Sequence, residues 1–257
     1  MKINIIRCRD HAAIGEITAN LIAKEIDLNP NLVLGLPTGQ TPIPVYQEIR
    51  KMYSEGKIDC SNVTTFNLDE YTRRGKGDPD SYYTFMHEQL FDHVPFKKSY
   101  LPNAKPENCD SMSDSELFQF LNKNSCPEYD SSIKKEGGIG LQIVGIGSNG
   151  HIAFNEPSDE ISDETCVVEL TDQTISDNAI KFYDGDETAV PKTAISMGMG
   201  KIMEAKSIIL IANGESKADA ICDAIEGPIT PQNPASLLRL HPDVTFIIDE
   251  AAAKLLD

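Results

Sequence analysis

The sequence predicts an α/β fold, a three-layer sandwich built around a mainly parallel, Rossmann-like sheet. Short apolar runs recur along the chain, and each is followed by a turn rich in glycine, proline or polar residues. A helical pattern of apolar residues follows most of these turns. Repeated strand–turn–helix units place parallel strands in one sheet and helices on both of its faces.

The length and charge of the chain limit what it can be. Its 257 residues fit one α/β domain or two small ones, and we favour a single domain over residues 1–257. The net charge of −17 argues against nucleic acid and against a membrane surface as partners, because both need a basic face. A phosphate site in such an acidic chain must be built locally from backbone N–H groups, a helix N-terminus and a few cations.

The cysteine pattern indicates a reducing compartment. The six cysteines form no CxxC pair and no close Cys/His cluster, which favours packing cysteines in a cytoplasmic protein over a disulfide framework or a zinc site. Residues 1–7 alternate like a strand and are too short and too charged for a signal peptide. No apolar run approaches the length of a membrane span.

The first third of the chain contains a candidate phosphate-binding turn. After the strand at residues 1–7, Asp10 is placed to cap a helix that ends near Asn29. Residues 32–36 predict a buried strand, and the turn Pro37–Pro42 connects it to the next helix. A Gly/Thr turn between a strand and a helix N-terminus can bind phosphate, but it also fits an ordinary connection. It is not a Walker A loop, because the Lys-Ser/Thr pair is missing.

Two carboxylates follow the next strand. Residues 63–71 predict a β-branched strand that runs directly into Asp69 and Glu70. Such residues can cap the next helix, coordinate a metal or act as a base. Asp69 follows a strand of the same predicted sheet as the turn at Thr38–Thr41, so we expect the two to meet in one crevice.

The middle of the chain is less regular. Arg73–Gly77 predicts a mobile basic loop, and residues 81–91 predict a helix in which His87 and His93 are structural. Residues 103–135 are polar, with one amphipathic patch. We expect a surface excursion with a helix there, and not a second domain.

Residues 141–157 carry the most informative pattern. A continuous apolar run ends in a glycine-rich turn, as expected for a strand buried on both faces, and His151 and Glu156 follow just past the strand's carboxyl end. In open α/β sheets ligands bind in the crevice outside the strand ends. His151 can act as a general base near neutral pH, with Glu156 orienting the ring and stabilising its cation. A purely structural pair of a buried histidine and a carboxylate is the alternative.

The last third repeats the strand–helix pattern. Part of residues 155–185 could form a lid over a ligand, and residues 207–212 predict a buried strand. Lys217 follows near a helix N-terminus, where a cation is unfavourable, so it is either simply exposed or serves an anion bound there. Residues 244–249 predict a last strand, with an alanine-rich helix after it.

These motifs resemble, in order and over nearly the whole chain, those of the glucosamine-6-phosphate deaminase family. The most specific are FNLDE at residues 66–70 and GHIAFNEP at residues 150–157. The second also distinguishes the chain from 6-phosphogluconolactonases, which share the fold but continue differently after the Gly-His pair. The matching segments are Gly35–Pro42, Phe66–Tyr71, Gly145–Pro157, Gly214–Ala218 and Leu240–Pro242.

The resemblance implies an aldose–ketose isomerisation coupled to deamination, which converts glucosamine 6-phosphate and water to fructose 6-phosphate and ammonium. By match to the family's motifs, His151 takes the proton that opens the sugar ring, with support from Glu156 and Asn149. Asp69 then abstracts the C2 proton and helps to return it to C1 through an enolamine. The implied chemistry needs no metal or organic cofactor.

The resemblance also implies a phosphate site and three departures from the family. Thr38, Gly39, Gln40 and Thr41 match the phosphate loop, and Lys217 matches its cation. Asn149 stands where many members have aspartate, and we expect it to keep a supporting hydrogen bond. Lys181 is the nearest cation to the family's phosphate-binding arginine, so either the grip on phosphate is weaker or the alignment is shifted by one. The region 166–168 lacks the basic residues of members activated by N-acetylglucosamine 6-phosphate, so we expect no such activation.

Three matters stay open at the level of sequence. A galactosamine-6-phosphate deaminase differs in the C4 stereochemistry that it accepts, which no residue settles. A non-catalytic sugar-phosphate sensor could keep the fold, although it would have no need of a base over C2. The small-molecule substrate is the expected partner, and a homo-oligomer is neither indicated nor excluded.

Overall fold

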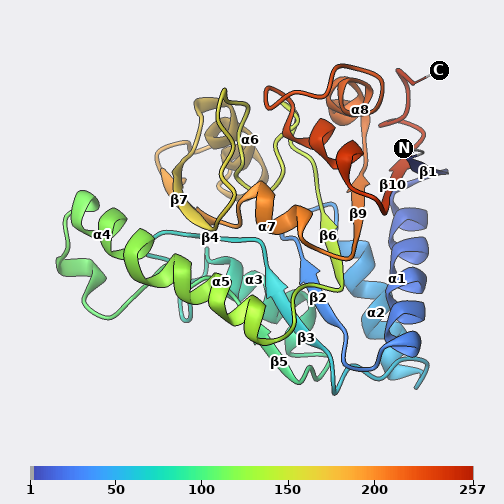
Figure 1. The fold of residues 1–257 in the computed structure, drawn as a ribbon, viewed down its shortest axis with the longest axis horizontal. Coiled ribbons are helices and arrows are strands. Elements are labelled where there is room, and N and C mark those ends of the chain that lie inside the picture. Colours follow the sequence, from blue (N-terminus) through green and yellow to red (C-terminus); the bar gives the residue numbers. More distant parts are fainter. Residues whose placement is uncertain (1–2, 257) are drawn as a thin grey trace.

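The centre of the molecule is a seven-stranded sheet in which every strand pair is parallel (Figure 1). The computed structural model describes residues 3–256, apart from the side chain of Lys181. The strand order is β1-β10-β9-β6-β2-β3-β5, which confirms the mainly parallel sheet. The strands are β1 (Asn4–Cys8), β2 (Val33–Leu36), β3 (Thr64–Asn67), β5 (Lys98–Tyr100), β6 (Leu141–Val144), β9 (Ser207–Ala212) and β10 (Val244–Asp249).

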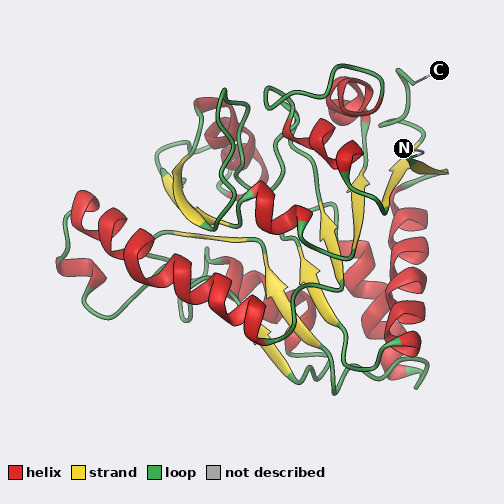
Figure 2. Cartoon of the chain, viewed as in Figure 1, coloured by secondary structure: helices red, strands yellow, loops and turns green. Residues whose placement is uncertain are grey.

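Helices cover both faces of this sheet and complete the three layers (Figure 2). Strand β9 shows why: Ile208 and Leu210 face one helical layer, while Ile209 and Ile211 face the other. One layer contains α1 (His11–Leu28), α2 (Ile43–Ser54), α3 (Tyr82–Met86) and the π-helical turn His87–Phe91. The other contains α5 (Cys126–Lys135), α7 (Met199–Met203), α8 (Ala218–Ile225) and the 3-10 helix Pro234–Leu240.

A second, three-stranded antiparallel sheet adjoins the first. It consists of β4 (Asp69–Tyr71), β8 (Thr193–Ser196) and β7 (Cys166–Glu169), in that order. The prediction of one strand over residues 63–71 is therefore wrong at Leu68. There the chain changes partners from β2 to β8, and the carbonyl of Leu68 accepts a hydrogen bond from the Met197 N–H at 2.8 Å. The two carboxylates that follow belong to the small sheet.

The polar segment before β6 is more deeply integrated than expected. A nearly continuous helical segment runs through α4 (Asp114–Phe120), the π-helical turn Leu121–Ser125 and α5. Tyr129 and Ile133 of α5 are buried against the sheet. The prediction of a surface excursion is wrong for this half, because the polar residues between these core positions conceal their helical spacing.

The first helix begins where the sequence predicts, but the helix expected after the last strand is absent from the described residues. Asp10 caps α1 as predicted, since its Oδ1 accepts the Ala13 N–H at 2.8 Å. After β10 the chain forms turns at residues 250–255 in place of the expected alanine-rich helix. The carboxylate of Asp249 accepts N–H groups of Ala252 and Gly214, which curls the chain back against the sheet.

The basic loop Arg73–Gly77 is tied down at both arginines. Arg73 donates to the carbonyls of Cys109 and Met112, and Arg74 forms an ion pair with Asp80 at 2.7 Å. These contacts argue against the predicted mobile loop.

The two histidines after α3 have structural partners, as the sequence predicted. His87 pairs with Asp92, and His93 contacts the carbonyl of Glu88.

None of the helices described between residues 3 and 256 combines the length and apolar character that a bilayer span needs.

Candidate active site

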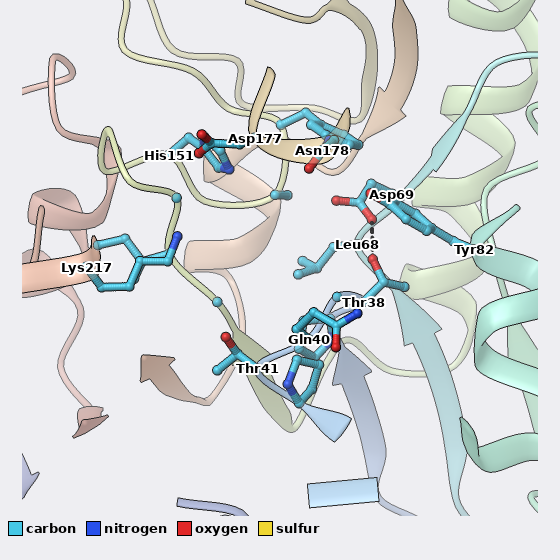
Figure 3. Close-up of a pocket in the computed structure, with 18 of the residues that line it drawn as sticks. Thr38, Gln40, Thr41, Leu68, Asp69, Tyr82, His151, Asp177, Asn178 and Lys217 are labelled. Carbon is cyan, nitrogen blue, oxygen red and sulfur yellow. Dashed lines mark hydrogen bonds between the residues drawn. The ribbon is translucent and has the colours of Figure 1, made fainter. Parts of the chain in front are cut away.

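A cavity of about 250 Å³ opens at the carboxyl ends of β2, β3, β6 and β9 (Figure 3). The chain runs outward through β3 and β5 on one side of β2, and through β6, β9 and β10 on the other. The cavity therefore lies at the point where the direction of strand order reverses, which is where open α/β sheets bind their ligands. Helix α6 (Asp172–Phe182) falls within residues 155–185, where the sequence allows a lid, and it lines the cavity through Asp177, Asn178 and Phe182.

Asp69 lines this cavity and is 6% exposed. Burial and the neighbouring charge of Glu70 raise the pKa of its carboxyl to about 8. The hydroxyl of Thr38 lies 3.5 Å from Asp69 Oδ1 and partly opposes that rise. A carboxylate in this setting is a stronger base than one in water, which suits it to remove a proton from carbon.

Glu70 has the other role that the sequence left open. Its carboxylate accepts the backbone N–H groups of Tyr71, Tyr82 and Tyr83 at 2.8–3.0 Å and so caps the start of α3. Burial raises the pKa of Glu70 to about 7, although these three hydrogen bonds oppose the effect. The adjacent carboxylates therefore divide between the cavity and a helix cap.

His151 is held by the tight turn that follows β6. The Gly147 N–H donates to the His151 carbonyl at 2.9 Å, and Gly150 takes the left-handed φ of +88° that closes the turn. A Cβ at Gly147 would lie 2.3 Å from the imidazole, so only glycine lets the ring pack there. Figure 3 shows the ring at the cavity, on the side away from Tyr82.

Glu156 and Asn149 lie behind the imidazole and support it. His151 Nδ1 lies 3.4 Å from Glu156 Oε2, and Asn149 Nδ2 donates to the same oxygen at 2.9 Å. Burial raises the pKa of Glu156, but interactions with His151, Thr174 and Asn149 outweigh it and leave the pKa below its usual value. An ionised Glu156 favours the tautomer with hydrogen on Nδ1, which leaves Nε2 as the proton acceptor.

The predicted phosphate loop lines the opposite wall. The four loop positions Thr38, Gly39, Gln40 and Thr41 all border the cavity. Gly39 has a φ of +104°, and the hydroxyl of Thr41 donates to Asn213 at 2.7 Å, which joins this loop to the one after β9. The loop is therefore held in a shape that can offer its backbone N–H groups to an anion.

Of the two predicted cations, the structure places Lys217 at the cavity. It follows β9, in the 3-10 turn Glu215–Lys217 before α8, and its amine points toward the centre of the cavity in Figure 3. Lys181 lies in α6, and its side chain is outside the described part of the structure.

Several residues at the cavity have no local signal in the sequence. Asp177 and Asn178 of α6 and Tyr82 of α3 line it, and Asn178 donates to the Tyr71 hydroxyl at 2.8 Å. They come from two helices that are remote in sequence from the glycine turns, so no short motif links them to the cavity. Within the described residues, no group of three or more His, Cys, Asp or Glu side chains is arranged to hold a metal ion.

Comparison with known proteins places this geometry in a family. The family model of glucosamine-6-phosphate isomerases and 6-phosphogluconolactonases matches residues 11–247. Glucosamine-6-phosphate deaminase of Thermoanaerobacter pseudethanolicus is 46% identical over 240 residues, which are 93% of this chain and 89% of the relative. The Clostridioides difficile deaminase is 42% identical over 255 residues, 98% of this chain and 96% of the relative.

A solved structure agrees with the sequence comparison. The structure of a monomeric glucosamine-6-phosphate deaminase superposes with a TM-score of 0.88 at 34% sequence identity, covering 98% of this chain and all of that one. The match of the family model to most of the chain, the identity of these relatives and the shared fold lead to one conclusion. The chain belongs to the family of glucosamine-6-phosphate isomerases and 6-phosphogluconolactonases.

Proposed function

We propose that the protein converts glucosamine 6-phosphate and water to fructose 6-phosphate and ammonium. The observation that carries this proposal is the meeting of two different bases, Asp69 and His151, in one cavity that also contains an anion loop and Lys217. A sugar phosphate held by the loop at one end would present its reacting carbons to the two bases. The names of the curated relatives support the same reaction.

We propose that His151 opens the sugar ring. Its Nε2 takes the proton of the C1 hydroxyl while the bond between C1 and the ring oxygen breaks, and the resulting imidazolium gives this proton to the ring oxygen. The products of this step are the open-chain aldehyde and a free C5 hydroxyl. Glu156 and Asn149 support the step by holding the ring in place and stabilising the imidazolium.

Asp69 carries the isomerisation in this proposal. Its carboxylate removes the C2 proton to give an enolamine and returns a proton to C1, which leaves an imine at C2. Water adds to that imine, and ammonia leaves to give the ketone. An ammonium group of the substrate next to Asp69 would favour the ionised carboxylate and so lower the pKa of this group from about 8.

Phosphate binding relies on local groups, because the net charge of −17 repels anions at long range. We propose that Thr38, Gly39, Gln40 and Thr41 hold the phosphate oxygens and that Lys217 supplies the cation. Lys181 is the candidate for a second cation on α6.

Ammonia release from glucosamine 6-phosphate and galactosamine 6-phosphate, measured side by side with metal-free protein, tests the proposal. We expect turnover of the first sugar only. Turnover of galactosamine 6-phosphate alone would support the same mechanism with galactosamine 6-phosphate as the substrate. If neither sugar releases ammonia although the protein still binds sugar phosphate, the result would favour a non-catalytic sugar-phosphate sensor.

Asp69→Asn tests the assignment of the base. The variant keeps the shape of the side chain but cannot take a proton, so we expect bound substrate and a kcat at least about 10²-fold lower. Unchanged turnover would remove Asp69 from the mechanism.

We further propose one domain over residues 1–257 and a cytoplasmic location. The small sheet starts directly after β3 and supplies Asp69 to the cavity, so the two sheets share one site. The six cysteines are all free, which suits a reducing compartment. The similar solved enzyme is a monomer, and we propose the same state for this chain.

A further inference from the structure

Thr174, in the first turn of α6, contacts both His151 and the carboxylate of Glu156 behind it. Its hydroxyl donates a short hydrogen bond to Glu156 Oε1 and lies 3.5 Å from His151 Nδ1. The residue is 2% exposed. A buried hydroxyl placed between a histidine and its carboxylate can fix the geometry of both.

The two oxygens of Glu156 are held from different parts of the chain. Asn149 and His151, both from the turn after β6, approach Oε2. Thr174 is the donor to Oε1 among the described side chains. The contact between His151 and Glu156, at 3.4 Å, is longer than the hydrogen bonds from Asn149 and Thr174, so these two donors contribute most to the orientation of the carboxylate.

Helix α6 is itself fixed against the same turn, which keeps Thr174 in place. The hydroxyl of Thr171 caps the helix by accepting the Thr174 N–H at 3.3 Å. One turn later, Asp177 accepts the hydroxyl of Ser148 at 2.7 Å. The helix that covers the cavity therefore also completes the support of the base.

We propose that Thr174 is a positioning residue, which orients Glu156 and through it the His151 imidazole for ring opening. This inference rests on the proposed function and deepens it. Without the hydroxyl, Oε1 of a side chain that is only 10% exposed would lack its donor. The carboxylate could then rotate away from the imidazole, and the pKa of Glu156 would rise because one of the interactions that lower it is lost.

Thr174→Val and Thr174→Ser test the proposal by ammonia release from glucosamine 6-phosphate. Valine keeps the shape and removes the donor, and we expect kcat to fall about 10- to 100-fold with little change in KM. Serine keeps the donor and should restore most of the activity. Thr18→Val is the matched control, because Thr18 of α1 is fully buried, its hydroxyl has no hydrogen-bond partner among the described residues, and it does not line the cavity.

A double-mutant cycle with Glu156→Gln separates positioning from a general loss of packing. If Thr174 acts through the carboxylate, Thr174→Val should cost little more once Glu156 is replaced. Full additivity of the two losses, or equal losses in the valine and serine variants, would overturn the proposal. So would a valine variant with the kcat and pH profile of the unmodified protein.

The ¹⁵N spectrum of the His151 ring gives a readout that needs no turnover. We expect Thr174→Val to change the tautomer balance of this ring, while Thr174→Ser and Thr18→Val leave it unchanged. If the unmodified protein releases no ammonia, the proposed function fails, but this spectrum still decides whether Thr174 orients the pair. An unchanged ring spectrum in a folded valine variant would reject the inference.

Discussion

At the scale of the residue, the same chemical group has different roles in adjacent positions. Asp69 has the hydroxyl of Thr38 as its hydrogen-bond donor and lines the cavity, while Glu70 is satisfied by three backbone N–H groups. Burial raises the pKa of both, yet of the two only Asp69 lines the cavity that also contains His151. Position relative to the cavity therefore distinguishes the candidate base from the structural carboxylate.

The pH dependence of kcat/KM should report Asp69. This parameter follows the free enzyme, in which the pKa of Asp69 is about 8, and only the ionised carboxylate can take the C2 proton. We expect kcat/KM to rise with pH and to level off above about pH 8, in initial-rate assays across the range. If kcat/KM instead levels off already near pH 4, burial does not raise the pKa of Asp69 as expected.

Asp69 should also lower stability as pH rises. Between its ordinary pKa of 3.8 and about 8, the carboxyl is protonated in the folded chain and ionised in the unfolded chain. The folded state then binds more protons, so its contribution to the free energy of unfolding falls with pH, by up to about 1.4 kcal/mol per unit.

Asn cannot ionise, so Asp69→Asn should be increasingly more stable than the unmodified protein from pH 4 to 8 in denaturant titrations. Asp27→Asn, at an exposed position of α1, is the control and should show no such trend. A stability difference for Asp69→Asn that does not vary with pH would contradict the expected linkage.

At the scale of the element, the turn after β6 can hold the imidazole of His151 because Gly147 has no side chain there. Gly147→Ala should place a methyl group 2.3 Å from the imidazole of His151, and the ring must move. We expect kcat to fall at least about 10-fold, because a displaced base loses its alignment with the substrate. Gly75→Ala is the control, since a Cβ there meets its nearest neighbour at an ordinary 3.5 Å.

The elements also show what local sequence can predict. The glycine turns, the strand ends and the residues Asp69, His151 and Lys217 follow from short patterns, and the structure brings them to one cavity. Thr174 and Asn178 could not be found this way, because their partners lie on distant segments. The break at Leu68 was also hidden, since it depends on a partner strand more than 120 residues away.

At the scale of the whole molecule, the cavity joins two sheets and a covering helix. The large sheet supplies the loop at residues 38–41 and the turn that contains His151. The small sheet supplies Asp69, and α6 supplies the donor to Glu156. The small sheet has a separate buried cluster that includes Tyr71, Phe154 and Ile175. Catalytic geometry therefore depends on how these units pack together.

The protein should not be activated by N-acetylglucosamine 6-phosphate. Strand β7 (Cys166–Glu169) has no basic residue and begins beside Thr165, whose N–H and hydroxyl donate to Asp130. An acidic neighbour does not favour a second phosphate there. Rates at subsaturating glucosamine 6-phosphate should stay constant when the acetylated sugar is added, and a clear rise would overturn this expectation.

The passage of the chain through Leu68 has a consequence for how the site can vary. Successive side chains of a strand point to opposite faces, so β4 assigns odd and even positions to different tasks. Deleting one residue before β4 would turn the side chain of Asp69 away from the cavity and that of Glu70 away from the start of α3. A deletion of two residues would restore the face but move Asp69 along the strand and put Tyr71 in its place, so we expect the length of this junction to be fixed to the residue.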